Sequence, residues 1–304
     1  MAATAVPREA SRRHGLSARR RRAAYALLSP GGAWLVAFFV GSVIVMGYMS
    51  LKSGGLLAGG FRFTWSFGNY VDALAGRQMF FLRSVLYAGA TTVGTVLLAY
   101  PAAYWIAFYG GRFKSALLFM ILLPYFVSFV IRTVQWKFIL ADNGILLGTL
   151  KDLGLLPEHF RVLSTWIAVI GGLIYNYLPF AALPLYVAIE RIERSVVEGA
   201  YDLYATPARV FAHVIFPLSM PGVFAATLLT FVPATGDYVE AEILGSPATK
   251  MIGNIIQSEY LTRGRYPVAA ALSMVLMFGM VVLTSLYAKL IGTEEETVAA
   301  AVGA

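Results

Sequence analysis

The chain has 304 residues, of which 59% are hydrophobic and only 13% are charged, and it carries a formal net charge of +8. Ordinary soluble domains contain roughly 25% charged residues, so a chain with a mean hydropathy of +0.70 is expected to have lipid as most of its solvent. This composition disfavours a soluble enzyme and a disordered protein. Cys is absent and the three His are far apart, so we expect no disulfide, no thiol nucleophile and no metal site.

A cluster of basic residues opens the chain. Seven Arg fall within residues 1–22, and a charge-free run follows over 23–51. A basic segment before an apolar run is typical of a membrane-orientation signal; the alternatives are a nucleic-acid-binding arm, although we expect no nucleic-acid partner, or an organelle transit peptide. The apolar core of a cleaved signal peptide is about 7 to 15 residues long. The longer run here predicts a helix that stays in the membrane.

Apolar runs of about the length needed to cross a bilayer recur along the chain. A bilayer core about 30 Å thick needs about 20 helical residues. Six candidate spans satisfy this length: 23–51, 84–111, 115–140, 162–189, 210–236 and 266–288. The third contains Arg132 and Lys137, and the others have no charge. Outer-membrane barrels would show alternating segments of about ten residues instead, so the sequence predicts an all-α bundle of six transmembrane helices.

Lys and Arg on alternate sides of these runs predict the orientation. With the N-terminus inside, the inner segments hold thirteen of them and the outer segments nine, which places both termini in the cytoplasm. The expected organisation is a basic cytoplasmic tail over 1–22, a transmembrane domain over 23–291 and a cytoplasmic C-terminal tail over 292–304. Gly, Pro and Asn punctuation predicts ordered loops with short re-entrant or interfacial pieces in three outer segments: 53–81, 141–161 and 237–265.

One inner loop, over 190–216, is polar enough to lie outside the membrane. Its acidic residues fall close to one helical stripe: Glu190, Glu193, Glu198 and Asp202. The pair Thr206-Pro207 is typical of a helix start, so we expect a helix, a sharp turn and a second short helix. Arg209 and Phe211 would give the second helix the mixed charged and aromatic surface that suits docking in a partner's groove. A solvated connector is the alternative.

Residues 198–223, EGAYDLYATPARVFAHVIFPLSMPGV, resemble the EAA signature of ABC-importer permease subunits. In that family the loop is a coupling helix that seats in a cleft of a cytoplasmic ATPase. The resemblance therefore implies a type I ABC importer permease fold. It also implies the residues that couple this chain to the ATPase: Glu198, Gly199, Ala200, Asp202, Tyr204, Arg209, Phe211 and Pro217.

Two of these residues depart from the family's pattern. Gly199 stands at its small second residue, and Tyr204 replaces the glycine that comes just before the turn. Glycine reaches a positive φ at little cost, whereas a bulky tyrosine does not. We therefore expect the turn to differ here, with the Tyr204 ring contributing to the ATPase contact.

Further segments resemble the spermidine/putrescine branch of this permease family: 124–136, 177–186, 236–239 and 251–257. The resemblance covers 30–291 and implies half of a translocation pathway for polyamines in the bacterial inner membrane. Related permeases carry other small cations or anions, which is the alternative for the substrate. A self-sufficient secondary transporter is a further alternative, but the sequence has neither paired carboxylates at mid-membrane depth nor two broken helices in related halves.

Catalytic motifs are missing from the chain. No Gly-Lys dipeptide occurs, which excludes the G-x-x-x-x-G-K-[ST] phosphate-binding loop, and neither G-x-S-x-G nor H-E-x-x-H is present. The resemblance therefore implies a transport subunit without a cofactor of its own, with ATP and Mg²⁺ on a separate ATPase dimer. It implies two more partners, a second permease subunit, expected to be a distinct homologous chain, and an extracytoplasmic substrate-binding protein.

Acidic residues gather where the fifth span leaves the membrane. Asp237, Glu240 and Glu242 lie there with Tyr238 between them. Carboxylates neutralise the ammonium groups of a polycation, and aromatic faces receive its methylene stems, so Asp237, Tyr238 and Glu240 are candidate substrate-pathway residues. The alternative, solvated acids on an outer loop, fits Glu240 and Glu242 better than Asp237.

Arg132 lies inside the third span, where a charge is costly unless it faces the bundle interior or reaches the interface. A fixed positive charge would not help a cation to pass, so we expect a structural role for Arg132 through pairing with a carboxylate such as Asp237. The aromatic candidates for the pathway are Trp136 and Tyr177, with Tyr125 and Tyr175 as further cavity aromatics. Positions in the interfacial aromatic belt explain most such residues equally well.

Overall fold

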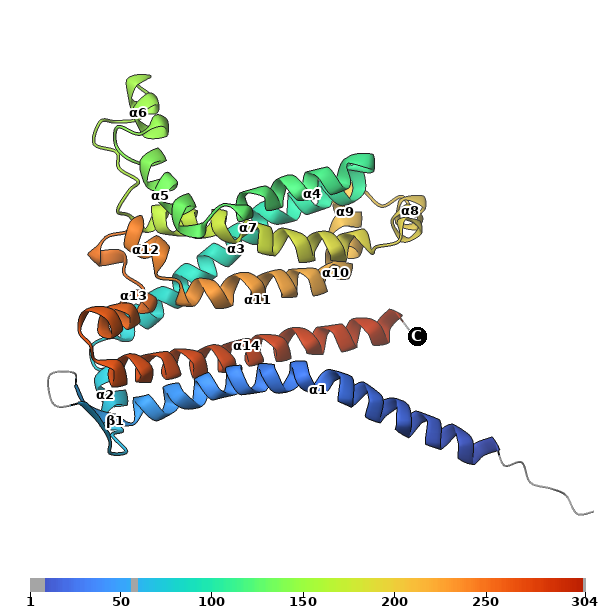
Figure 1. The fold of residues 1–304 in the computed structure, drawn as a ribbon. Helices are drawn as coiled ribbons and strands as arrows, with labels where there is room; N and C mark the ends of the chain where they lie inside the picture. The colour runs from blue at the N-terminus through green and yellow to red at the C-terminus, as the bar shows by residue number, and fades with distance from the viewer. Residues whose placement is uncertain (1–8, 56–59, 303–304) are drawn as a thin grey trace, which may run out of the picture.

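The computed structural model describes residues 9–55 and 60–302, with the side chains of 25–55 and 60–289. Long helices lie side by side through most of the molecule (Figure 1). They are α1 (Glu9–Ser50), α3 (Gln78–Tyr109), α7 (Trp166–Glu190), α11 (Met220–Gly236) and α14 (Tyr266–Val302). A charge-free helix satisfies its own backbone hydrogen bonds and can face lipid all round. The prediction of an all-α membrane fold is confirmed.

The segment predicted as one span over 115–140 is sharply bent. After η2 (Gly111–Phe113), it consists of α4 (Lys114–Leu122), η3 (Leu123–Phe126) and α5 (Phe129–Ile139), and the two halves meet at 90°. Pro124 has no amide hydrogen to continue the helical ladder. Val127 and Ser128 then take extended backbone conformations, with ψ of 140° and 132°. The bend turns α5 away from the direction of α4.

A second bend precedes α11. The chain passes through α9 (Pro207–Val210), the π-helical turn η4 (Phe211–Ile215) and α10 (Phe216–Leu218), and meets α11 at 63°. Pro217 and Pro221 lie on either side of the break, where a missing amide hydrogen favours a kink. By length and composition, four helices in the described part of the chain can cross a membrane, or six if each bent pair is one span.

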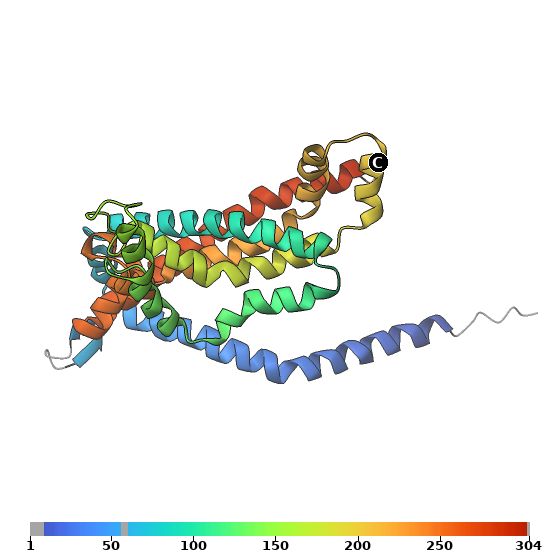
Figure 2. The ribbon, with the colours of Figure 1, turned by 90° about the horizontal axis from the view of Figure 1, so that it is seen from above.

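The two ends of the bundle differ in what they carry. One end holds the short elements of the outer segments: β1 (Lys52–Gly55), β2 (Gly60–Phe63), α2 (Gly68–Leu74), α6 (Ile145–Asp152), α12 (Val239–Ile243), η5 (Pro247–Thr249), α13 (Ile252–Gln257) and η6 (Ser258–Thr262). The strands pair antiparallel, with Lys52 opposite Phe63. The opposite end holds α8 (Arg194–Asp202), the start of α1 and the end of α14 (Figures 1 and 2).

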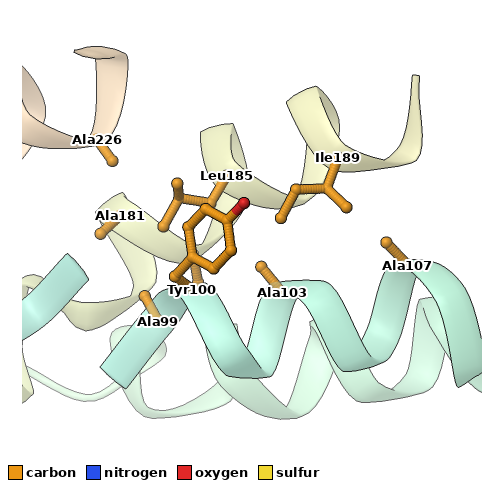
Figure 3. Close-up of a cluster of buried hydrophobic side chains, with 9 residues drawn as sticks. Ala99, Tyr100, Ala103, Ala107, Ala181, Leu185, Ile189 and Ala226 are labelled. Carbon is orange, nitrogen blue, oxygen red and sulfur yellow. The ribbon is translucent and has the colours of Figure 1, made fainter. Parts of the chain in front are cut away.

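The bundle core lies where α3, α7 and α11 pack together. Figure 3 shows alanines of all three helices around Tyr100 and Leu185. Small side chains let helix backbones approach closely, which is how helices pack where lipid is the solvent. Gly222 of α11 is such a contact, because an added Cβ there would overlap Ala188 of α7. The Tyr100 hydroxyl is satisfied within this core by the hydroxyl of Ser219, at 2.7 Å.

Helix α1 stands apart from this core. It packs against α14, and none of the residues in the apolar window of its Tyr25–Ser50 stretch is buried. Some of its large side chains, such as Leu27 and Phe39, are more than two-thirds exposed. A helix that is apolar all round and unburied needs lipid or another protein around it.

Candidate functional site

The end of α11 is held against α7 by one carboxylate. Gly236 ends the helix, and Asp237 follows in an extended conformation, with ψ of 134°. Its Oδ1 accepts a hydrogen bond of 2.9 Å from the backbone N–H of Val239, and its Oδ2 accepts one of 2.9 Å from the Tyr177 hydroxyl. The backbone contact is the local turn that Asp side chains favour. Asp237 and Tyr177, both predicted pathway residues, are therefore in direct contact.

A second carboxylate, Glu240 of α12, is completely buried. Its Oε1 accepts hydrogen bonds from the Asn176 side-chain amide and, at 3.2 Å, from the Thr133 hydroxyl. Its Oε2 accepts none from any described residue. The reading of Glu240 as a solvated acid is wrong, because α12 folds back between α5 and α7 and carries this side chain inward. Glu240 and Asp237 lie on the same short connection, so two acids meet at the outer part of the bundle.

Glu242, two residues further on, has a different environment. Its side chain is about half exposed, and its Oε2 accepts a hydrogen bond of 2.9 Å from Asn254. The ammonium group of Lys250 lies 3.9 Å from the same oxygen. The reading of Glu242 as a solvated acid therefore agrees with the structure.

Arg132 on α5 is 7% exposed, and the predicted ion pair with Asp237 is not formed. No carboxylate of the described chain lies within 4.0 Å of its guanidinium. Its charge instead lies 5.9 Å from the ring centres of Tyr125 and Phe129. The prediction failed because Asp237 is already engaged by Tyr177 and by its own backbone, whereas the bend before α5 directs Arg132 to a separate cavity.

That cavity has a volume of about 450 Å³ and lies between α5 and α7. Most of its lining residues are aromatic: Tyr125, Phe126, Phe129, Tyr177 and Phe180. The other polar ones are Ser128, Arg132 and Asn176. The volume falls within the range of small-molecule sites. The cavity thus shares Asn176 with Glu240 and Tyr177 with Asp237.

Two predicted pathway residues lie elsewhere. The Trp136 ring packs on Tyr175, with ring centres 5.3 Å apart, and belongs to an apolar cluster with Leu140 and Leu244. Tyr238 is 41% exposed and lines a larger cavity of about 810 Å³ that α1 and α14 also line. The structure therefore brings together Asp237, Glu240 and Tyr177 but places Trp136 and Tyr238 apart from them.

Asn176 and Thr133 are site residues that the sequence reasoning missed. Both are buried, and both donate to Glu240. Asn176 is the only Asn in the apolar run 162–189, and a strongly polar side chain inside a span usually faces the protein interior. That signal could have identified it, whereas a threonine in a helix often bonds its own backbone, as Thr133 also does to Phe129.

The polar loop at the other end of the bundle ends its first helix in an unusual way. After α8, the Ala205 N–H donates to the carbonyl of Ala200 at 3.2 Å, and the Tyr204 N–H donates to that of Tyr201 at 2.8 Å. This is the Schellman pattern, in which the residue after the helix takes a left-handed conformation and is usually glycine. Tyr204 takes it here, with a φ of +58°. The turn is thus of the kind that favours glycine, although a tyrosine forms it.

Side chains of this loop divide into exposed and packed ones. Glu198, Asp202 and Arg209 are exposed, and Tyr204 is 95% exposed. Phe211 is 38% exposed, but its ring also packs edge-on against Tyr100 and Tyr104 of α3, with ring centres 5.7 and 6.0 Å away. Of the remaining predicted coupling residues, Gly199 is exposed, and Ala200 and Pro217 are half-buried.

The predicted start of the second short helix is only partly as expected. Thr206 precedes the helix and Pro207 is its first residue, as predicted, but the Thr206 side chain makes no capping hydrogen bond. Proline at the first helical position presets φ and leaves no amide hydrogen unsatisfied. Pro207 therefore contributes to the start of α9, and the hydroxyl of Thr206 does not.

Comparisons with known proteins agree on one family. The family described as binding-protein-dependent transport system inner membrane component matches residues 96–290. The spermidine/putrescine transport system permease protein PotB of Haemophilus influenzae is 38% identical over 205 residues, covering 67% of this chain and 72% of that protein. PotB of Escherichia coli is 31% identical over 258 residues, covering 84% and 92%.

Among solved structures, a bacterial ABC transporter involved in the import of the acidic polysaccharide alginate has a similar fold. Its matching chain superposes with a TM-score of 0.66 and 19% sequence identity. The match covers 93% of this chain and 99% of the other. At this identity the likeness concerns the fold alone.

Proposed function

The chain belongs to the binding-protein-dependent transport system inner membrane component family and is a membrane-spanning permease subunit of an ABC importer, not an enzyme, and on this premise we propose that it forms half of a translocation pathway for polyamines. One observation carries the proposal for the substrate. Two carboxylates, Asp237 and Glu240, lie beside an aromatic cavity and share with it Tyr177 and Asn176.

Carboxylates beside an aromatic cavity suit both chemical parts of a polyamine. Its ammonium groups are stabilised by carboxylates, and the methylene stems between them pack against aromatic faces. The spermidine/putrescine permeases named above support the same substrate class. The second candidate is a small anion, and Arg132 favours it, because a guanidinium that lines the cavity and has no carboxylate partner among the described residues would attract negative charge.

The polar loop is proposed as the ATPase contact. Glu198, Asp202, Tyr204 and Arg209 present charged and aromatic groups to solvent at the bundle end opposite the acidic site. A separate ATPase dimer that binds ATP and Mg²⁺ would dock there. A second permease chain would complete the pathway, and an extracytoplasmic binding protein would deliver the substrate at the end that carries α6 and α13. Under this proposal both termini lie in the cytoplasm.

Transport by the whole assembly tests the proposal. The chain, its ATPase, the second permease and the binding protein are reconstituted in vesicles, and ATP-dependent uptake of radiolabelled spermidine and putrescine is compared with that of a small organic anion. We expect uptake of at least one polyamine. Anion uptake without polyamine uptake would replace the substrate assignment with the second candidate, and uptake without any ATPase subunit would contradict the coupling role of the loop.

A further inference from the structure

Glu240 of α12 and Arg132 of α5 are both buried, and the two side chains form no ion pair. Glu240 is fully buried, and its Oε2 accepts no hydrogen bond from the described chain. Arg132 is 7% exposed, and its buried Nε and Nη1 donate to no acceptor there. A buried ion without a partner is strongly destabilising, whereas a paired and hydrogen-bonded one is tolerated. Burial and the neighbouring carboxylate of Asp237 raise the pKa of Glu240 to about 9, so a cation beside its unsatisfied oxygen would favour the ionised form, and Arg132 lacks an acceptor of that kind among the described residues.

Two residues that contact Glu240 are also neighbours of Arg132, one along the chain and one across its cavity. Thr133, next to Arg132 on α5, donates its hydroxyl to Glu240. Asn176 donates its amide to the same carboxylate and also lines the cavity that Arg132 faces. The Oδ1 of Asn176 accepts no hydrogen bond from any described residue. Asn176, which contacts Glu240, thus also carries an acceptor that no described residue satisfies, beside the cavity that Arg132 lines.

The aromatic rings around Arg132 do not replace a carboxylate. Tyr125 and Phe129 lie 5.9 Å from its charge, close to the distance limit of about 6 Å for a cation–π contact. A ring face is also only a weak hydrogen-bond acceptor for the N–H groups of a guanidinium. The present position of Arg132 is therefore incompletely satisfied.

Helix α5 has the backbone geometry to move. It is separated from η3 by Val127 and Ser128, which are extended and follow a 90° bend. Hinges are commonly a few residues at the ends of elements that absorb changes of φ and ψ. A rotation there would shift Arg132 relative to Asn176 and leave the packed core of α3, α7 and α11 intact.

We propose that Arg132 is a tethered cation that forms an ion pair with Glu240 in a second conformation of the permease, and that a substrate ammonium group and this guanidinium exchange at the carboxylate. The exchange rests on the proposed function, whereas the ion pair does not. Without substrate the guanidinium compensates the carboxylate, and an arriving ammonium releases it to its aromatic cavity. Arg132 is then a positioning and specificity residue, because only a cation can displace it.

A charge-reversal cycle on the purified whole transporter tests the ion pair without any substrate. The variants are Arg132→Glu, Glu240→Arg and the two combined, and Lys137→Glu is the control, since Lys137 is an exposed cation on the same helix. Each single reversal buries two like charges, so we expect the melting temperature to fall by more than about 5 °C. The double variant should regain at least half of the summed loss, and the control should change little.

Additive losses in the double variant would overturn the ion pair. If a reversed variant does not accumulate in the membrane, the neutral set Arg132→Gln, Glu240→Gln and their combination gives the same cycle. If the two residues interact, the fall in melting temperature of the double variant is again smaller than the sum of the two single falls. A double fall equal to that sum again overturns the ion pair.

The exchange is tested by repeating the cycle with spermidine and its binding protein present. The coupling is the difference between the summed single falls in melting temperature and the fall of the double variant. We expect this coupling between positions 132 and 240 to decrease at least twofold, because the ammonium group replaces Arg132 at the carboxylate. Unchanged coupling in a transporter whose wild type takes up spermidine overturns the exchange alone. A wild type that takes up no polyamine overturns the proposed function, and the substrate-free cycle still decides the ion pair.

Discussion

The Tyr177 hydroxyl donates a 2.9 Å hydrogen bond to Oδ2 of Asp237 and so ties the middle of α7 to the residue that follows α11. Both partners are anchored on other sides. Asp237 also accepts from the Val239 backbone, and Tyr177 is 9% exposed and packs in an apolar cluster with Leu173 and Met251. The Asp237 carboxylate is therefore held by its own turn on one oxygen and by the Tyr177 hydroxyl on the other.

Replacing Tyr177 with Phe removes that hydroxyl and keeps the ring. A hydrogen bond to a charged group is worth about 1.5–3 kcal/mol, so we expect uptake by the reconstituted transporter to fall at least about tenfold. Asp237→Asn should give a loss of roughly ten- to a hundredfold, and adding Tyr177→Phe to it should cost little more, because both changes remove the same contact.

Tyr175→Phe is the matched control, since the Tyr175 hydroxyl makes no hydrogen bond within the described chain and its ring packs on Trp136. Uptake by this control should stay within twofold of the wild type. Equal losses in the control and in Tyr177→Phe would mean that any polar change on α7 disturbs transport, and the specific role of the Tyr177–Asp237 contact would be rejected.

A different carboxylate, Glu259 of η6, holds the outer end of the bundle together. It is 1% exposed and forms ion pairs of 2.7–2.8 Å with Arg77, Arg263 and Arg265. Burial alone would raise the pKa of Glu259, but hydrogen bonds from Arg265 and the charges of all three arginines outweigh it and hold this pKa below its ordinary value. The cluster joins the start of α3 to the segment before α14.

The lowered pKa of Glu259 determines how its contribution to the stability of the fold depends on pH. A carboxyl group whose folded-state pKa is depressed stabilises the fold above its unfolded pKa, about 4.3, and loses that contribution as the pH falls through the folded value. Glu259→Gln should therefore cost about 2–4 kcal/mol at neutral pH. In thermal unfolding scans, the difference in melting temperature between this variant and the wild type should stay constant down to about pH 5 and disappear at lower pH.

Asp142→Asn is the control for this pH series. Asp142 pairs with Lys151 and Arg161 at 3.3 and 3.0 Å, but it is 39% exposed. Exposed ion pairs are worth about 0–1 kcal/mol, so this variant should melt close to the wild type throughout. If Glu259→Gln still melts below the wild type at low pH, the loss of stability comes from altered packing and not from the lost charge.

How far the sequence predicts this structure differs between the spans and the site. Charge-free runs identified the helices because lipid excludes unsatisfied backbone groups. The bend before α5 was missed, because Pro124 permits several outcomes and tertiary packing selects one. Glu240 and Glu242 have similar local sequence surroundings, and only the way α12 folds back buries one and exposes the other.

The arrangement of the two bundle ends makes the topology testable. Asp72 and Asp152 are exposed at the end that carries α2 and α6, and Ala212 is exposed near α8 at the other end. The chain contains no Cys, so single cysteines at these positions can be labelled without background. An impermeant thiol reagent added to intact cells should label positions 72 and 152 but not 212. Labelling of 212 alone would reverse the proposed orientation.

The coupling loop gives two variants with different expected effects. Glu198 is exposed, so Glu198→Ala should leave the melting temperature unchanged and lower ATPase co-purification or coupled uptake several-fold. Phe211 is partly exposed and packs on Tyr100 and Tyr104, so Phe211→Ala should also destabilise the chain, by less than the roughly 3–5 kcal/mol that a fully buried Phe costs. Arg194→Ala, at an exposed residue that begins α8, is the control. Wild-type coupling in both Glu198→Ala and Phe211→Ala would reduce the loop to a connector.

The last prediction concerns Tyr204, which holds a φ of +58° in a turn that usually contains glycine. A left-handed conformation costs a residue with a side chain about 1–2 kcal/mol, and glycine avoids that cost but loses more chain entropy on folding. Tyr204→Gly should therefore raise the free energy of unfolding slightly or leave it unchanged, and uptake should survive. Tyr204→Ala separates the effect of the ring from that of the backbone, since it removes the ring and keeps a residue with a side chain in the left-handed turn.

Comparing the two variants shows what the exposed ring contributes. If the ring contacts the ATPase, both should lower ATPase co-purification by the same modest factor, and only Tyr204→Ala should keep the backbone strain, seen as a lower melting temperature than Tyr204→Gly. Unchanged co-purification in both would remove Tyr204 from the ATPase contact. Complete loss of uptake in Tyr204→Gly with a normal melting temperature would contradict the prediction and show that transport depends on the tyrosine side chain or on a rigid turn.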